Sequence, residues 1–141
     1  MRCEEIMKYD IACASPDDPV LLAARRMREH NIGFLPVCDA SMHVLGTVTD
    51  RDLAIRVLAE ARPASTPVSE VMTREMVACS PRDDLREAER KMGSAQKSRI
   101  MCVDDAGKLC GIISLSDIAQ VATKTRASDT LREVSAREAR V

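Results

Sequence analysis

Two short segments of the chain place a hydroxyl and a carboxylate at the same spacing, and each segment follows an apolar stretch. Residues 46–52 read GTVTDRD, and residues 111–117 read GIISLSD. In both, a Ser or Thr precedes an acid by three positions. This spacing is typical of a helix N-terminus, where the hydroxyl and the carboxylate cap backbone N–H groups. One interpretation of Thr49 with Asp52, and of Ser114 with Asp117, is therefore a helix cap alone.

The same residues also suit a phosphate or sugar ligand. Each segment lies where a strand is expected to end and a helix to begin, and the free N–H groups and the helix dipole attract phosphate there. A carboxylate at that place can accept hydrogen bonds from both hydroxyls of a ribose. Arg51 adds a positive charge in the first segment. Leu115 and Ser116 add none in the second, where Arg99 is the candidate cation.

These two segments are corresponding parts of an internal repeat. When the sequence is shifted by 65 residues against itself, many residues coincide without a gap at helix starts, turns and apolar positions. Met7 then falls on Met72, and Asp52 falls on Asp117. The repeat predicts a first copy over 1–60, a linker over 61–67, a second copy over 68–123 and a charged tail over 124–141. We expect the tail to be partly helical from about Ser128.

Each copy is expected to fold as strand, helix, strand, strand, helix. A short apolar stretch opens the copy, at 11–14 and again at 76–79. Asp18-Pro19 then predicts a helix start, with Asp18 as the cap. Two strands follow in each copy, and a second helix closes it. The strands are predicted at 34–38, 44–49, 100–103 and 109–114, and the apolar faces of the closing helices at Leu53, Ala54, Val57, Leu58, Ile118, Ala119 and Ala122.

This pattern predicts an α/β chain of the α+β type, built from two tandem β-α-β-β-α units. A three-stranded sheet with two helices cannot bury both of its faces alone. Packing of one copy on the other about an internal pseudo-twofold axis would cover one face. The first helices still carry apolar side chains that need cover, which predicts a homodimer. These side chains are Val20, Met27, Leu85 and Met92.

The composition argues against several classes of protein. The 21 basic residues are balanced by 22 acidic ones, and the chain has one Tyr, one Phe and no Trp, which argues against a nucleic-acid-binding face. No apolar run approaches the length of a membrane span, and acids stand near the N-terminus where a signal peptide is apolar. We therefore expect a cytoplasmic protein. The six cysteines lack the C-x-x-C spacing, so no metal site is expected and most thiols should be reduced and buried.

Both copies resemble cystathionine-β-synthase (CBS) domains, a family whose members occur as tandem pairs. The resemblance covers about residues 4–123. It rests on several short signatures, each of which is weak alone and specific in combination. They are the apolar-Met pairs at 6–7 and 71–72, the Ser-Pro pairs at 15–16 and 80–81, the GFLPV run at 33–37 and the two Ser/Thr-x-x-Asp segments.

The resemblance implies a regulatory module and not an enzyme. Pairs of this family bind adenosine-containing ligands such as AMP, ADP, ATP or S-adenosylmethionine in clefts between the two copies, form flat dimers and require no other cofactor. By position, Asp52 and Asp117 correspond to the ribose-binding acids, and Thr49 and Ser114 to hydroxyls near ribose or phosphate. The first strands would contact the base, at Ala12, Cys13, Val77 and Ala78. The output would pass to another, unidentified effector protein.

Two other interpretations remain open. The chain could be a redox or stress-response protein that signals through its cysteines, since Cys13 and Cys38 fall on strands that should be neighbours and could approach disulfide distance. It could also be a dimeric scaffold that binds a partner protein without any ligand. A catalytic role is not expected, because His30 and His43 fall at a helix end and in a turn, where solvation explains them.

Overall fold

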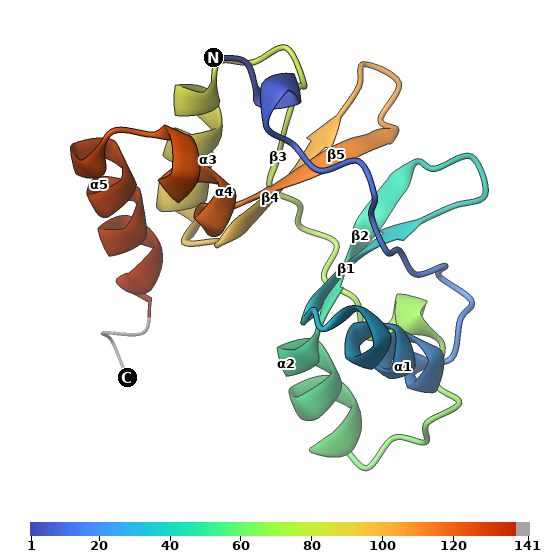
Figure 1. The fold of residues 1–141 in the computed structure, drawn as a ribbon. Helices are drawn as coiled ribbons and strands as arrows, with labels where there is room; N and C mark the ends of the chain where they lie inside the picture. Colours follow the sequence, from blue (N-terminus) through green and yellow to red (C-terminus); the bar gives the residue numbers. More distant parts are fainter. Residues whose placement is uncertain (138–141) are drawn as a thin grey trace. The chain divides into compact units, whose positions relative to one another are not determined.

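The chain forms two compact units that do not coincide with the two halves of the sequence. The computed structural model describes residues 1–137 (Figure 1). Unit 1 comprises Met1–Ile11 together with the chain from Val77 onward, and unit 2 comprises Ala12–Met76. Each unit mixes helices with a small sheet, as predicted for an α+β fold.

Unit 2 has a two-stranded sheet and two longer helical segments. Its elements are α1 (Val20–His30), β1 (Phe34–Cys38), β2 (Val44–Thr49), α2 (Asp50–Asp52), the π-helical segment η2 (Leu53–Leu58) and the 3₁₀ turn η3 (Val68–Glu70). The strands β1 and β2 are antiparallel, and Phe34 lies opposite Thr49. Asn31 ends α1 in the left-handed conformation, with a φ of 51°, as its position after the helix pattern predicts. The core gathers Ala23 and Met27 of α1 against Leu35 and Val48 of the sheet.

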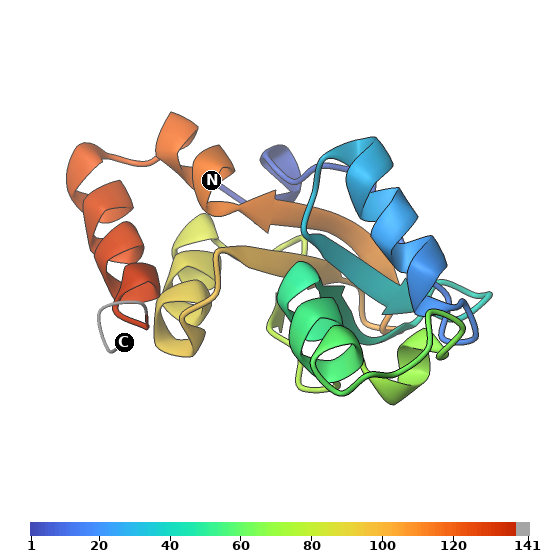
Figure 2. The same cartoon turned by 90° about the horizontal axis from the view of Figure 1, so that it is seen from below.

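Unit 1 has a three-stranded sheet and three helices. Its elements are the 3₁₀ turn η1 (Cys3–Glu5), β3 (Ala78–Cys79), α3 (Leu85–Ala95), β4 (Arg99–Val103), β5 (Leu109–Ser114), α4 (Leu115–Val121) and α5 (Lys124–Ser135). The strand order is β3-β4-β5, with β3 parallel and β5 antiparallel to β4. Leu85 and Met92 of α3 pack on Ile100 and Ile113 of this sheet. Helix α5 lies beside α3 in both views (Figures 1 and 2).

The segment that opens each sequence copy packs against the sheet of the other copy. In unit 1, Lys8 and Ile112 exchange backbone hydrogen bonds of 2.9 and 3.0 Å. In unit 2, Thr73 and Thr47 exchange backbone hydrogen bonds of 2.8 and 2.9 Å. The repeats read from the sequence and the folded units are therefore different segments of the chain.

The predicted opening strands are too long. Strand β3 has only two residues, and in unit 2 the corresponding stretch forms a single parallel bridge between Ala14 and Val37. The missing residues are at the start of each predicted stretch, and the ends agree. There the carboxylates of Asp18 and Asp83 accept hydrogen bonds from the backbone N–H groups of Ser15 and Ser80, at 2.9 Å each, and turn the chain. The prediction that Asp18 caps α1 is also wrong, since Pro19 is the N-cap residue and has no side-chain cap.

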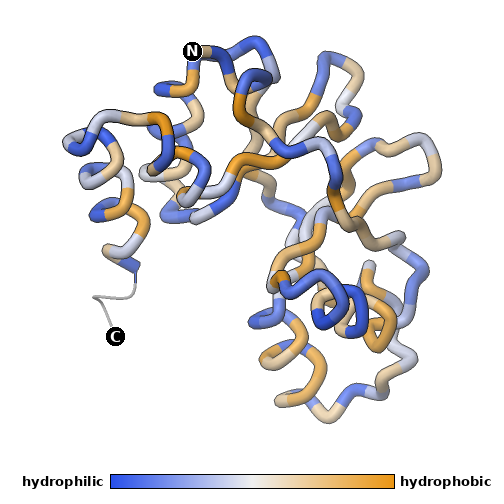
Figure 3. Tube along the Cα trace, in the orientation of Figure 1, coloured by the Kyte–Doolittle hydropathy of each residue, from blue (hydrophilic) through white to orange (hydrophobic). Residues whose placement is uncertain are grey.

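The apolar face predicted for the closing helix of the first copy is only partly buried. The helix begins as α2 but changes to π-helical winding from Leu53 to Leu58, which alters the directions of its side chains. Val57 is buried, whereas Leu58 is 79% exposed and Ala54 is exposed. Ala119 in the second copy is exposed as well. The η2 segment is hydrophobic over much of its length in Figure 3.

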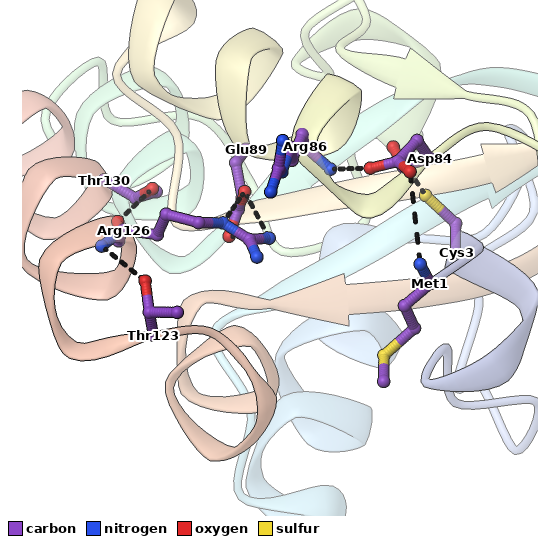
Figure 4. A network of polar contacts seen from close by, with 8 residues as sticks. All are labelled: Met1, Cys3, Asp84, Arg86, Glu89, Thr123, Arg126 and Thr130. Carbon is purple, nitrogen blue, oxygen red and sulfur yellow. Dashed lines mark hydrogen bonds and ion pairs between the residues drawn. The ribbon is translucent and has the colours of Figure 1, made fainter.

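The tail forms a helix that begins earlier than predicted. Helix α5 starts at Lys124, because the hydroxyl of Thr123 accepts a hydrogen bond from the backbone N–H of Arg126 at 3.2 Å. Arg126 then donates to both carboxylate oxygens of Glu89 on α3, at 2.9 to 3.2 Å (Figure 4). Glu89 is buried, so this pair fixes α5 against α3. Residues 138–141 of the predicted tail lie outside the described residues.

The apolar side chains that motivated the dimer prediction are covered within their own units. Val20 and Met27 belong to the core of unit 2, and Leu85 and Met92 to the core of unit 1. The exposed large apolar side chains lie elsewhere, and they include Ile55 and Leu58 of η2, Val121 of α4 and Leu131 of α5.

Candidate functional site

The strand-to-helix junction of unit 2 is a reciprocal cap. Thr49 ends β2 in an extended conformation and is the N-cap of α2. Its Oγ1 accepts a hydrogen bond from the N–H of Asp52 at 3.1 Å, and Oδ2 of Asp52 accepts one from the N–H of Thr49 at 3.0 Å. The capping interpretation of the sequence is therefore correct here.

The cap uses one carboxylate oxygen of Asp52 and leaves the other in a polar setting. The Oδ1 atom lies 3.4 Å from Oγ1 of Thr73 and 3.8 Å from Nε of Arg56. The Asp52 side chain is 12% exposed. The second oxygen thus faces two side chains that can donate hydrogen bonds.

The junction of unit 1 repeats this geometry. Oγ of Ser114 accepts a hydrogen bond from the N–H of Asp117 at 3.1 Å, and Oδ2 of Asp117 accepts one from the N–H of Ser114 at 2.8 Å. The Oδ1 atom of Asp117 lies 3.4 Å from Nζ of Lys8, and the Asp117 side chain is 15% exposed. Both junctions therefore present a charged oxygen that the helix does not use.

Lys8 and Thr73 are partners that reading the sequence locally did not identify. Both lie far along the chain from the acid they contact, on the segment that opens a sequence copy. The signal that could have found them is the repeat itself, because the 65-residue shift places Lys8 on Thr73. Local motifs identify the acids but cannot show which distant segment crosses them.

The proposed cations differ in position. Arg99 opens β4 directly opposite Ser114, so it belongs to the unit 1 junction. Arg51 lies in the first turn of α2 and is exposed, and its backbone N–H donates to the carboxylate of Asp50 at 2.8 Å. Arg56, which the sequence reading did not select, lies nearer to Asp52.

The residues expected to contact the base lie on the short segments before the first helices. Ala12 and Cys13 in unit 2, and Val77 and Ala78 in unit 1, are all partly exposed. A cation from the following helix binds a carbonyl in each segment. Arg26 donates to the carbonyl of Cys13 at 2.9 Å, and Lys91 donates to that of Ala78 at 3.0 Å.

The thiols of Cys13 and Cys38 contact each other, and no disulfide joins them in the structure. A hydrogen bond from the Cys38 thiol lowers the pKa of Cys13, and Arg26 assists. The same hydrogen bond raises the pKa of Cys38 above its ordinary value, as does its burial. Cys13 is therefore the more nucleophilic of the two.

Comparison with known proteins gives the family. The model of the CBS domain matches residues 3–59 and residues 68–124. This chain belongs to the CBS domain family. The two matches cover most of the chain and are in tandem, so the molecule is a CBS domain pair. CBS domain pairs are in general regulatory and not catalytic.

Individual relatives agree with this assignment. The CBS domain-containing protein YhcV of Bacillus subtilis is 38% identical over 116 residues, which cover 82% of this chain and 81% of the relative. The crystal structure of Hypoxic Response Protein I with two coordinated zinc ions is 27% identical with a TM-score of 0.79, over 87% of this chain and 100% of that one. The CBS domain pair of protein MJ0100, in complex with 5'-methylthioadenosine and S-adenosyl-L-methionine, is 25% identical with a TM-score of 0.76, over 86% of this chain and 94% of that one.

Two further observations concern the function classes. Among the described residues, no helix has both the length and the apolar character needed to cross a bilayer. Within residues 1–137, no three His, Cys, Asp or Glu side chains form a group arranged to hold a metal ion.

Proposed function

We propose that this CBS pair is a regulatory module that binds an adenosine-containing ligand, AMP, ADP, ATP or S-adenosylmethionine. Asp52 and Asp117 are the groups that accept the ribose hydroxyls. The observation that carries the proposal is that the two oxygen atoms of each carboxylate make different contacts. The Oδ2 atom caps the helix, and the Oδ1 atom faces side-chain donors, namely Thr73 and Arg56 in unit 2 and Lys8 in unit 1.

The chemistry of the junction suits a nucleoside. The cap fixes the carboxylate, so little side-chain entropy is lost when ribose hydroxyls donate to it. Hydrogen bonds to a charged group contribute about 1.5–3 kcal/mol each. Arg51 and Arg99 are the candidates for charge contacts with phosphate, and Thr49 and Ser114 for contacts with ribose or phosphate. The CBS pair of MJ0100, with its two adenosine-derived ligands, supports this ligand class.

The proposed result of ligand binding is a change in a second protein molecule that contacts this chain. We place no catalytic step on this chain, so ligand binding must alter its contacts with a second copy or with an effector protein. The ligand then acts by favouring the conformation that it binds more tightly.

A thermal-shift screen tests this function. The wild-type protein is melted with AMP, ADP, ATP and S-adenosylmethionine, each at up to millimolar concentration. A ligand at 100 times its Kd should stabilise the folded state by about 2.7 kcal/mol, which is a readily measured rise in Tm. Inosine monophosphate serves as a matched control for AMP, from which it differs only in the base. Flat melting curves with all four ligands would contradict the proposal and favour a ligand-free scaffold.

A second candidate function is redox signalling through Cys13 and Cys38. Contact between their thiols in unit 2 favours it, and one structural neighbour is a hypoxic response protein. Thiols counted with and without reductant, in wild type and in Cys13→Ala, separate the two candidates. A wild-type protein that loses two more thiols than the variant under mild oxidation would support this function, and equal losses would contradict it.

A further inference from the structure

Three cysteine side chains from separate segments meet in the core of unit 1. Cys3 lies in η1, Cys79 on β3 and Cys102 on β4, and all three are buried. The Sγ atom of Cys79 lies 3.8 Å from that of Cys3 and 3.6 Å from that of Cys102. The Cys102 thiol also lowers the pKa of Cys3. The sulfur atom of Cys79 is therefore in contact with both of the other two.

The three corresponding residues of unit 2 contain no sulfur. The residues that the repeat places there are Val68, Ala14 and Val37, and all three are buried. The backbone around this position makes an equivalent hydrogen bond in both units. The N–H of Cys3 donates to the carbonyl of Asp83 at 2.9 Å, as that of Val68 donates to the carbonyl of Asp18 at 2.8 Å.

The strand pairing is equivalent too. Cys79 lies opposite Cys102 on parallel strands, as Ala14 lies opposite Val37. Aliphatic side chains therefore fill this position well, and packing alone does not require three thiols in unit 1.

The contacts make the thiols chemically unequal. Hydrogen bonds from Cys102 and Cys79 lower the pKa of Cys3 and outweigh the opposing effects of burial and of Asp83. The bond to Cys3 and burial raise the pKa of Cys102. Since thiolates are the nucleophiles in sulfur chemistry, Cys3 is the member that reacts first.

We propose that Cys3 and Cys79 form a reversible disulfide that attaches the opening segment of the chain to the sheet of unit 1. The bond requires the two sulfur atoms to approach to about 2.05 Å. Cys3 lies on a single 3₁₀ turn outside the sheet, so it can shift toward Cys79. Cys79 and Cys102 are less able to move together, because the register of β3 and β4 fixes both.

Hydrogen peroxide is the oxidant in this proposal. The Cys3 thiolate attacks one peroxide oxygen, the O–O bond breaks, and hydroxide leaves and takes a proton to form water. The sulfur of Cys79, losing its proton, then attacks the sulfenic acid of Cys3. The S–S bond forms, and a second water leaves. Local opening of η1, a single 3₁₀ turn near the N-terminus, admits the peroxide.

The bond would also hold the residue that contacts the ribose-binding acid of unit 1. Lys8 follows Cys3 on the same opening segment and lies 3.4 Å from Asp117. Its backbone position would be more firmly fixed in the oxidised protein. The disulfide itself does not depend on any nucleotide, so it can be tested separately from the proposed ligand function.

Peptide mapping tests the bond, because trypsin places each cysteine on a separate peptide. The native protein is treated with hydrogen peroxide and quenched, free thiols are blocked with N-ethylmaleimide, and the digest is analysed by mass spectrometry without reductant. The expected product joins peptide 3–8 to peptide 75–82 and disappears on treatment with dithiothreitol.

The repeat supplies matched controls. Cys3→Val introduces the residue of position 68 and should abolish the linked peptide. Cys102→Val introduces the residue of position 37 and should leave it. Circular dichroism verifies that both variants fold. The proposal is overturned if Cys3 and Cys79 are recovered as blocked thiols after oxidation, or if Cys79 is linked to Cys102.

Discussion

At the scale of the residue, the two junction acids have a structural role, and we propose that they also have a binding role. Asp52 and Asp117 each give one oxygen to a helix cap, at 3.0 and 2.8 Å from the N–H of the preceding Thr or Ser. The cap holds each side chain in one rotamer, which leaves its second oxygen in a defined place. A fixed, largely buried carboxylate is a good acceptor for a pair of ribose hydroxyls.

The cap can be separated from the acid by changing its hydroxyl. Thr49→Ala removes the acceptor for the N–H of Asp52, and we expect the free energy of unfolding to fall by about 0.5–2 kcal/mol. Thr49→Ser keeps the acceptor and should lose little. Urea unfolding followed by circular dichroism measures both variants. If Thr49→Ala is as stable as wild type, then the hydrogen bond at 3.1 Å contributes nothing to the helix.

At the scale of the element, two glycines allow the opening segments to cross the sheets. A Cβ atom at Gly46 would lie 2.5 Å from the carbonyl oxygen of Thr73, and one at Gly111 would lie 2.7 Å from the side chain of Met7. Backbone cannot yield as easily as a flexible methionine. The crossing at Gly46 is therefore the less tolerant of the two.

We expect Gly46→Ala to destabilise the protein more than Gly111→Ala, although the positions are equivalent in the repeat. The substitution at Gly46 must displace Thr73 and weaken its two hydrogen bonds with Thr47, at a cost of about 1–3 kcal/mol. Thermal melts of the two variants provide the measurement. An equal or larger fall in Tm for Gly111→Ala would contradict this account of the crossings.

The helices and strands also show which parts of the fold can be predicted from the sequence alone. The strands predicted at 34–38, 44–49 and 109–114 have the bounds of β1, β2 and β5, because short apolar runs bounded by turns mark them. The π-helical winding of η2 and the early start of α5 were not predicted. The first leaves no mark in the local pattern. The second follows from the Thr123 cap, a local signal that the sequence analysis did not use, and the contact of Arg126 with Glu89, 37 positions away, could not be predicted from local sequence.

The candidate site likewise contains residues that the sequence predicted and residues that it did not. Both acids follow from their motif and both caps were confirmed, whereas Lys8, Thr73 and Arg56 come from tertiary packing. The three-thiol cluster of unit 1 was missed for the same reason. Its members stand at positions 3, 79 and 102, and no spacing rule connects them.

At the scale of the whole molecule, we predict a homodimer. The apolar residues first expected at its interface are buried, so the prediction now rests on exposed side chains such as Leu58 and Ile55 of η2. Light scattering at micromolar concentration should give twice the chain mass of 15.5 kDa. Leu58→Glu should shift the mass toward one chain while the circular dichroism spectrum is retained. A wild-type mass near 15.5 kDa would contradict the prediction.

The most direct test of the central claim is calorimetric titration of AMP, ADP, ATP and S-adenosylmethionine into wild type, Asp52→Ala, Asp117→Ala and the double variant. Loss of two charge-assisted hydrogen bonds, each about 1.5–3 kcal/mol, should weaken binding at the altered site at least about tenfold, since about 1.4 kcal/mol corresponds to that factor.

Asp50→Ala is the control, because Asp50 is a neighbouring acid outside the Thr49–Asp52 cap. We expect wild type and Asp50→Ala to bind, each single variant to lose one site, and the double variant to bind nothing. If the double variant melts at a lower temperature but binds a nucleotide as tightly as wild type, the two acids are helix caps only and the proposed site is wrong.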